Sequence, residues 1–127
     1  MTQEEKQLLL TDLSVRLPYK VKLNCCGDIG EKLISINSDG LINSDYDIEE
    51  VKPYLLPLSS MTEEQKYTCP IGVGELETFI KKDNWSVLTI SPNEIIHFVN
   101  WLNKNHFDYR GLIEKSLALD ATGKNIY

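Results

Sequence analysis

Five consecutive residues, His106-Phe107-Asp108-Tyr109-Arg110, bring four polar functional groups together just after a predicted helix. In an extended segment, His106, Asp108 and Arg110 project to one side. An aspartate beside a histidine fixes its tautomer, and an arginine can hold an anion. These three residues are therefore candidate catalytic groups. The alternative is a loop stabilised by an Asp–Arg pair, with Phe107 and Tyr109 in the core. The lack of a nucleophile close in sequence favours that alternative.

Five side chains are potential zinc ligands, but their spacing argues against a zinc site. Zinc sites usually offer pairs of ligands spaced by two to four residues. Two adjacent cysteines on a strand point their thiols to opposite faces, and His97 falls opposite the apolar face of its predicted helix. We therefore expect buried thiols, and we predict no metal and no cofactor. The five residues are Cys25, Cys26, Cys69, His97 and His106.

Segment 37–43, Asn-Ser-Asp-Gly-Leu-Ile-Asn, matches the middle of a calcium-binding loop. The first and twelfth positions of that loop would be Ser35 and Tyr46, where an aspartate and a bidentate glutamate are required. Without those charges we expect a hairpin turn. The segment Gly72-Val73-Gly74 is too short for a phosphate-binding loop, so we expect a flexible connection there.

The net charge of −6 is concentrated in one part of the chain. Nine acids stand against two lysines from Asp28 to Glu64, whereas the charges balance from Ser91 to the end. Such a negative segment repels phosphate backbones and disfavours nucleic acid as a partner. An acidic surface usually aids solubility, and it can also attract a basic protein. The acids assigned to such an interaction are Asp45, Asp47, Glu49 and Glu50.

A chain of 127 residues, 42% of them apolar, is expected to form a single globular domain. The longest apolar run near the N-terminus, Leu8 to Leu10, is too short for a secretion signal. No segment approaches the roughly 20 apolar residues that a bilayer requires. An odd number of cysteines, two of them adjacent, favours free thiols. These features predict a soluble cytoplasmic protein with no membrane segment and leave its oligomeric state open.

Helix-capping residues predict where three helices begin. Thr2 with Glu5 forms a capping box, Thr62 opens a second helix, and Ser91 with Glu94 opens the clearest one. Cys69-Pro70 ends the second helix, and a further helical turn is expected near Glu75 to Lys82. The helix after Ser91 should bury one apolar stripe, with Ile96 and Trp101 at its shoulders. The residues of that stripe are Ile95, Phe98, Val99 and Leu102.

Alternating apolar and polar residues predict strands at 21–25 and 32–37, and 85–90 is rich in strand-forming residues. A short helical turn is expected within 47–55, and a last helix around 112–119. The predicted fold is a single α+β domain over 1–127, strand-rich at 19–59 and helix-rich at 62–121. Its sheet is small and antiparallel, and an SH3-like barrel is one possible refinement. The tail at 122–127 is expected to be loose, although Ile126 and Tyr127 are able to dock.

Three stretches of the chain carry a family resemblance: 13–19, 48–62 and 101–115, the last containing the run Phe-Asp-Tyr-Arg-Gly-Leu-Ile-Glu-Lys. They resemble a family of small proteins of Bacteroides and related gut bacteria, often encoded in phage-derived or mobile regions. The family has no assigned function. The resemblance implies a cytoplasmic protein of mobile-element origin, and it brings no activity, cofactor or catalytic residue.

We therefore expect the chain to be a non-enzymatic protein-binding or adaptor protein. It would engage a basic partner through the acidic segment, or use Trp101, Tyr109 and Arg110. The alternative is a small hydrolase or transferase, which requires a pocket where His106 faces Asp108 or a thiol. A structural component of a larger assembly is a third hypothesis, and it predicts a large apolar patch or a stable oligomer.

Overall fold

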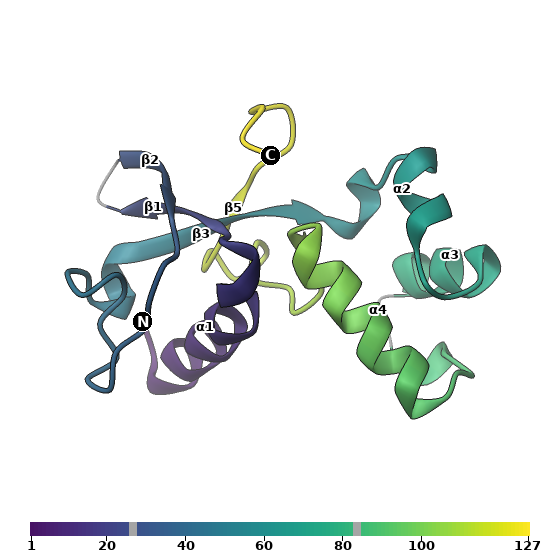
Figure 1. Ribbon diagram of the computed structural model, residues 1–127, viewed down its shortest axis with the longest axis horizontal. Coiled ribbons are helices and arrows are strands. Elements are labelled where there is room, and N and C mark those ends of the chain that lie inside the picture. Colours follow the sequence, from purple (N-terminus) through teal and green to yellow (C-terminus); the bar gives the residue numbers. More distant parts are fainter. Residues whose placement is uncertain (26–27, 83–84) are drawn as a thin grey trace.

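The computed structural model describes residues 1–25, 28–82 and 85–127 and confirms the α+β class (Figure 1). Cys26 and Gly27, of the adjacent cysteine pair and a predicted turn, lie outside the described residues. The helices are α1 (Gln3–Arg16), α2 (Glu63–Thr68), α3 (Val73–Lys82) and α4 (Pro92–Lys104). The strands are β1 (Lys22–Cys25), β2 (Asp28–Lys32), β3 (Val51–Pro57), β4 (Phe107–Asp108) and β5 (Leu119–Asp120).

Capping boxes begin α1, α2 and α4 at the predicted residues. Thr2 accepts a hydrogen bond from the backbone N–H three residues on, and the side chain there accepts one from the Thr2 N–H. Thr62 and Ser91 do the same for α2 and α4. Each box satisfies backbone donors that a helix start leaves unpaired. These local signals place the helix starts correctly.

The sheet is mixed and open: its three N-terminal strands pair antiparallel as expected, but two C-terminal strands add parallel pairs and no barrel closes. Strand β1 pairs antiparallel with both β2 and β3. Strand β3 also pairs in parallel with β4 and β5, which come from the C-terminal part of the chain. The strand order is β2-β1-β3-β4, with β5 also on β3. Figure 1 shows β3 running across the molecule from the α1 side towards α2.

The strand predicted at 32–37 lies earlier in the chain, as β2 (Asp28–Lys32), and the side chain of Asn43 explains why it ends at Lys32. Its Oδ1 accepts hydrogen bonds from the N–H groups of Ile34 and Ser35 at 2.7 and 3.2 Å. Its Nδ2 donates to the Lys32 carbonyl at 2.8 Å. Ile34, which lies in the predicted strand, is 72% exposed. The Asn43 side chain thus forms the backbone hydrogen bonds that a neighbouring strand would otherwise form. The sheet therefore does not extend past Lys32 towards a closed barrel.

Two further predicted elements are replaced by turns. Segment 85–90 forms a short 3₁₀ helix, η4 (Trp85–Val87), followed by irregular chain. There the Trp85 ring packs on Phe79 with ring centroids 4.7 Å apart. The helix predicted at 112–119 is a series of turns that leads into β5. Gly111 and Ser116 have φ of 72° and 61°, the left-handed conformation that interrupts a helix.

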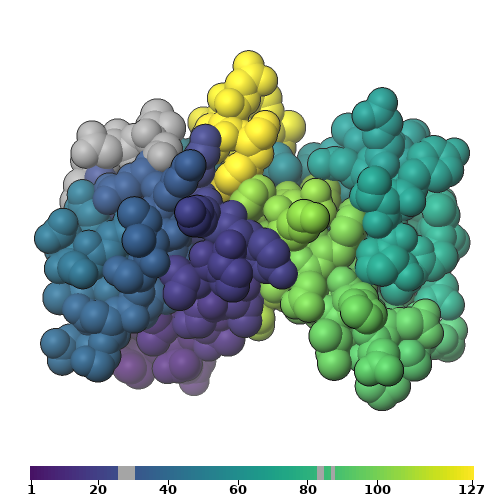
Figure 2. Space-filling view, in the orientation of Figure 1, coloured from purple at the N-terminus to yellow at the C-terminus, as the bar shows by residue number. Residues whose placement is uncertain are grey.

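The predicted helical turn within 47–55 is confirmed only for η2 (Ile48–Glu50), because Val51 already begins β3. Two hydrophobic clusters form the interior, one around α1 and β1 and the other among α3, α4 and β4. Strand β3 contributes to both, through Leu55 in the first and Leu56 in the second. In Figure 2 the C-terminal segment lies between the α1 side and the α2–α3 side. No helix in the described ranges is long and apolar enough to cross a membrane.

Candidate functional site

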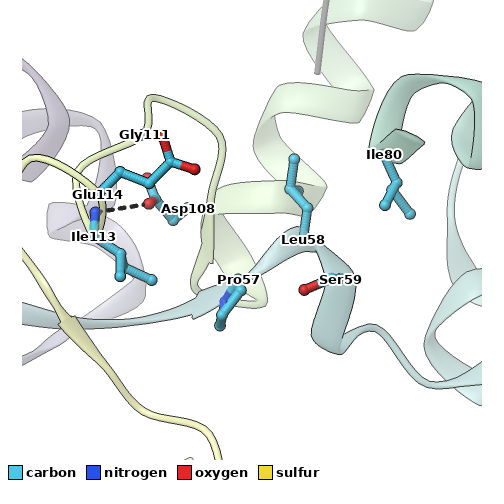
Figure 3. A pocket seen from close by; sticks show the side chains of 8 residues that line it. All are labelled: Pro57, Leu58, Ser59, Ile80, Asp108, Gly111, Ile113 and Glu114. Atoms are coloured by element: carbon cyan, nitrogen blue, oxygen red, sulfur yellow. Dashed lines mark hydrogen bonds between the residues drawn. The ribbon is translucent and has the colours of Figure 1, made fainter. Parts of the chain in front are cut away.

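Asp108 holds the turn that follows it. Its Oδ1 accepts hydrogen bonds from the N–H groups of Arg110 and Leu112 at 3.3 and 3.0 Å, and its Oδ2 accepts one from Ile113 at 2.9 Å. Figure 3 shows the last of these bonds. The residue is only 8% exposed. No hydrogen bond between Asp108 and His106 is found in the part of the chain that the structure describes, and both carboxylate oxygens serve the backbone.

His106 turns away from the predicted arrangement because its φ is 63°, so the segment is not extended through it. Its ring stacks on the ring of Tyr127, with centroids 3.7 Å apart and an interplanar angle of 11°. Burial, with the nearby charges of Arg16 and Lys22, lowers the pKa of His106 from 6.5 to about 4. The imidazole is therefore neutral at neutral pH and packed against the C-terminal segment.

Tyr127 anchors the C-terminal segment between two strands, so the expected loose tail docks there. Pairing of Leu23 with Pro53 makes Lys22 and Tyr54 the next pair along β1 and β3. In an antiparallel ladder, hydrogen-bonded and non-hydrogen-bonded residue pairs alternate. Because Pro53 has no N–H to donate, its pair is expected to be a non-hydrogen-bonded one, and the Lys22–Tyr54 pair would then carry the backbone hydrogen bonds. The Tyr127 hydroxyl instead accepts from the Lys22 N–H at 2.7 Å and donates to the Tyr54 carbonyl at 2.8 Å. It thus bridges the two strands.

The partly buried, neutral His106 predicts a pH-dependent stability. Its pKa is 6.5 when unfolded and about 4 when folded, so the unfolded chain binds more protons between these values. The contribution of neutral His106 to the free energy of unfolding is fully present above pH 6.5 and is lost as the pH falls towards 4. Because the ring is partly exposed, we expect a loss of about 1–2 kcal/mol. His106→Asn, which tolerates a positive φ, should lose less stability over this range in urea titrations. Parallel losses in both proteins would contradict the assignment.

Asp12 is fully buried between two arginines that come from distant parts of the chain. Its Oδ2 accepts from Nε of Arg16 at 2.7 Å, and its Oδ1 accepts from Nε of Arg110 at 3.2 Å. Arg16 is also fully buried and donates from Nη2 to the Phe107 carbonyl at 2.6 Å. These contacts join α1 to the segment around β4. The network consists of two cations and one carboxylate.

Tyr109 packs against both guanidinium groups. The central carbon of Arg16 lies 5.3 Å from the centroid of the Tyr109 ring, and that of Arg110 lies 5.1 Å from it. These distances suit cation–π contacts. The Tyr109 hydroxyl donates to Oδ1 of Asn103 on α4 at 2.8 Å. Arg110 is therefore held by Asp12 at Nε and by the Tyr109 ring at its guanidinium group.

Beside Arg110, an apolar groove of about 320 Å³ opens along α4. We call it the Arg110 groove, and it is lined by Trp85, Ile95, Val99, Tyr109 and Arg110. The stripe predicted on α4 is buried at Phe98 and Leu102, but Ile95 stays 38% exposed, so the prediction for that residue is wrong. Trp85 is also 38% exposed. The groove is an uncovered part of the helix's apolar face with one cation at its edge.

A second pocket, of about 280 Å³, lies next to Asp108 (Figure 3). Among the described residues that line it there is no histidine or cysteine, and the one hydroxyl side chain belongs to Ser59. Within the described residues, no three His, Cys, Asp or Glu side chains gather as a metal site would need. The lining residues are Pro57, Leu58, Ser59, Ile80, Asp108, Gly111, Ile113 and Glu114.

The acids assigned to partner binding are exposed, but three of them make local contacts. Oδ1 of Asp47 accepts from the Glu49 N–H, and Oε1 of Glu50 accepts from the Asp47 N–H, which caps η2. Glu49 pairs with Lys6 at 2.9 Å. The fourth acid, Asp45, is exposed in the loop before η2. These contacts give three of the acids a part in the fold.

Of the other predicted partner-binding residues, Tyr109 and Arg110 lie in the Arg110 groove, whereas Trp101 does not. The Trp101 indole donates from Nε1 to Oγ1 of Thr68 at 3.1 Å and stacks on Phe98. Comparison of the chain with family models, curated proteins and solved structures gives no match. Function is therefore inferred from the geometry of the chain itself.

Proposed function

We propose that this chain is a non-enzymatic protein-binding protein that docks a segment of its partner in the Arg110 groove. The observation that carries the proposal is the uncovered apolar face of α4 at Ile95, next to an arginine fixed by a buried carboxylate. Aromatic residues and arginine are enriched in the energetically dominant parts of protein interfaces. A groove of about 320 Å³ is small and suits a few side chains.

The hydrolase or transferase alternative has less support. It requires His106 to face Asp108 or a thiol, and the contacts described above give both residues other partners. Cys25 is buried in the cluster around α1.

A cytoplasmic adaptor of phage or mobile-element origin, as the family resemblance implies, would act on host proteins. A basic partner on the acidic segment stays a separate proposal, weakened by the local contacts of Asp47, Glu49 and Glu50.

Two neighbouring isoleucines of α4 provide a matched test. Ile95 lines the groove, whereas Ile96 is 57% exposed and is not among the lining residues. Peptides would be selected from a displayed random library against the folded protein, and their dissociation constants measured for each variant. Ile95→Asp places a charge in the groove and should weaken binding by about tenfold or more. Ile96→Asp should change it less than about twofold, as a surface substitution away from the contact.

Melting temperatures of both variants would show that the folded fraction is unchanged in the binding assay. The proposal is wrong if no selected peptide depends on Ile95, or if the two substitutions weaken binding equally.

A further inference from the structure

We propose that the Arg110 groove recognises a carboxylate of its partner. The carboxylate binds the outer edge of the Arg110 guanidinium while an adjoining apolar side chain fills the groove between Trp85 and Ile95. This inference rests on the proposed function and adds the chemistry of the partner to it.

The charge balance of the buried network is the first support. Asp12 is the only acid that forms an ion pair with Arg16 or Arg110 in the described ranges, and it pairs with both. Asp108, the other buried acid of this region, directs its oxygens to the backbone N–H groups of residues 110, 112 and 113. Two guanidinium groups thus share one carboxylate. Arg110 therefore shares its ion-pair partner with Arg16, and an incoming carboxylate would give it one of its own.

The hydrogen-bonding pattern of the two arginines is the second support. Nη1 of Arg16 is buried and has no hydrogen-bond partner among the residues that the structure describes. Unpaired buried donors are costly, and the Arg16 charge adds to the positive potential beside Tyr109. Arg110, with its side chain 26% exposed, uses Nε for Asp12 and Nη2 for a long 3.5 Å contact with the Tyr109 hydroxyl. The outer edge of its guanidinium therefore keeps donors for a ligand.

Preorganisation of Arg110 is the third support. Asp12 and the Tyr109 ring restrict its side chain before any partner arrives. A restrained arginine loses less conformational entropy on binding, and its planar fork matches the two oxygens of a carboxylate. Among the residues that the structure describes, Arg110 is also the only charged one that lines the groove. Charge complementarity therefore favours an acidic peptide segment with an apolar side chain next to the acid.

The experiment uses the selected peptides and the full chain. Each peptide is made with its acidic side chain changed to the matching amide, and separately with its C-terminus amidated. One of the two changes should weaken binding by about tenfold. The change that does so shows whether the carboxylate comes from a side chain or from a chain terminus. The same change should have no effect on binding to an Arg110→Gln variant.

Two further variants separate a specific contact from general attraction. Arg110→Lys keeps the charge but lacks the fork, and it should recover only part of the affinity. Lys104→Gln removes an exposed charge at the end of α4, outside the groove, and should change affinity less than about twofold. If acid and amide peptides bind the native protein equally while Ile95→Asp still abolishes binding, the carboxylate inference is overturned and the proposed function stands. Failure to select any groove-dependent peptide overturns both.

Discussion

Asp12→Asn is expected to lower the free energy of unfolding by about 3–5 kcal/mol. The substitution keeps the shape of the side chain but removes the one carboxylate that pairs with Arg16 and Arg110. Arg16 is fully buried and would then hold an unpaired charge away from water. Leaving one partner of a buried ion pair without the other costs far more than the intact pair contributes. Urea-induced unfolding followed by circular dichroism measures this loss.

Glu49→Gln is the matched control for that substitution. Glu49 also accepts from a cation, Lys6, at 2.9 Å, but the two side chains are 48% and 35% exposed. Surface ion pairs of this kind contribute about 0–1 kcal/mol, so the control should stay within that range. If Asp12→Asn were no more destabilising than Glu49→Gln, the Asp12 network would not be what joins α1 to the β4 segment.

Asp108→Ala is the second large expected effect, a loss of about 2–4 kcal/mol in the same unfolding experiment. The carboxylate accepts from three backbone N–H groups of the turn at residues 110–113. Without it, these donors lose their acceptor in a half-buried turn, which also carries Arg110. Asp108→Asn, which keeps one carbonyl oxygen, should fall between the native protein and the alanine variant.

Asp120→Ala gives the comparison. Asp120 also caps a turn, accepting from the Thr122 N–H at 2.8 Å, but that turn is exposed. Water can replace this single acceptor, so the loss should be below about 1 kcal/mol. Equal losses at positions 108 and 120 would mean that Asp108 does not support the turn, and would return it to the list of candidate catalytic groups.

Helix-capping signals predicted the starts of three helices correctly in this chain. The capping boxes at Thr2, Thr62 and Ser91 are confirmed because each depends on residues three positions apart. The end of β2 could not be predicted, because it depends on Asn43, a residue eleven positions beyond Lys32. Strands β4 and β5 have two residues each and form parallel pairs, which leave no periodic pattern in the sequence.

Two residues of the proposed site, Tyr109 and Arg110, were among the predicted partner-binding residues. Asp12 and Arg16 were missed, although their signal was present in the sequence. They fall on the same face of α1 as Leu9 and Leu13, so two opposite charges occupy core positions one helical turn apart. The exposure of Ile95 had no such signal. The apolar stripe of α4 looks the same in sequence whether or not another element covers all of it.

The most direct test of the proposed function uses the two tryptophans of the chain. Trp85 lines the Arg110 groove, whereas the Trp101 indole is hydrogen-bonded to Thr68 and lies outside it. In a ¹⁵N nuclear magnetic resonance titration with a selected acidic peptide, the indole signal of Trp85 should shift progressively while that of Trp101 stays in place. The backbone signals of Ile95 and Arg110 should move with Trp85. Binding that leaves the Trp85 signal unmoved, or that instead shifts the signals of Asp47, Glu49 and Glu50, would contradict docking in this groove.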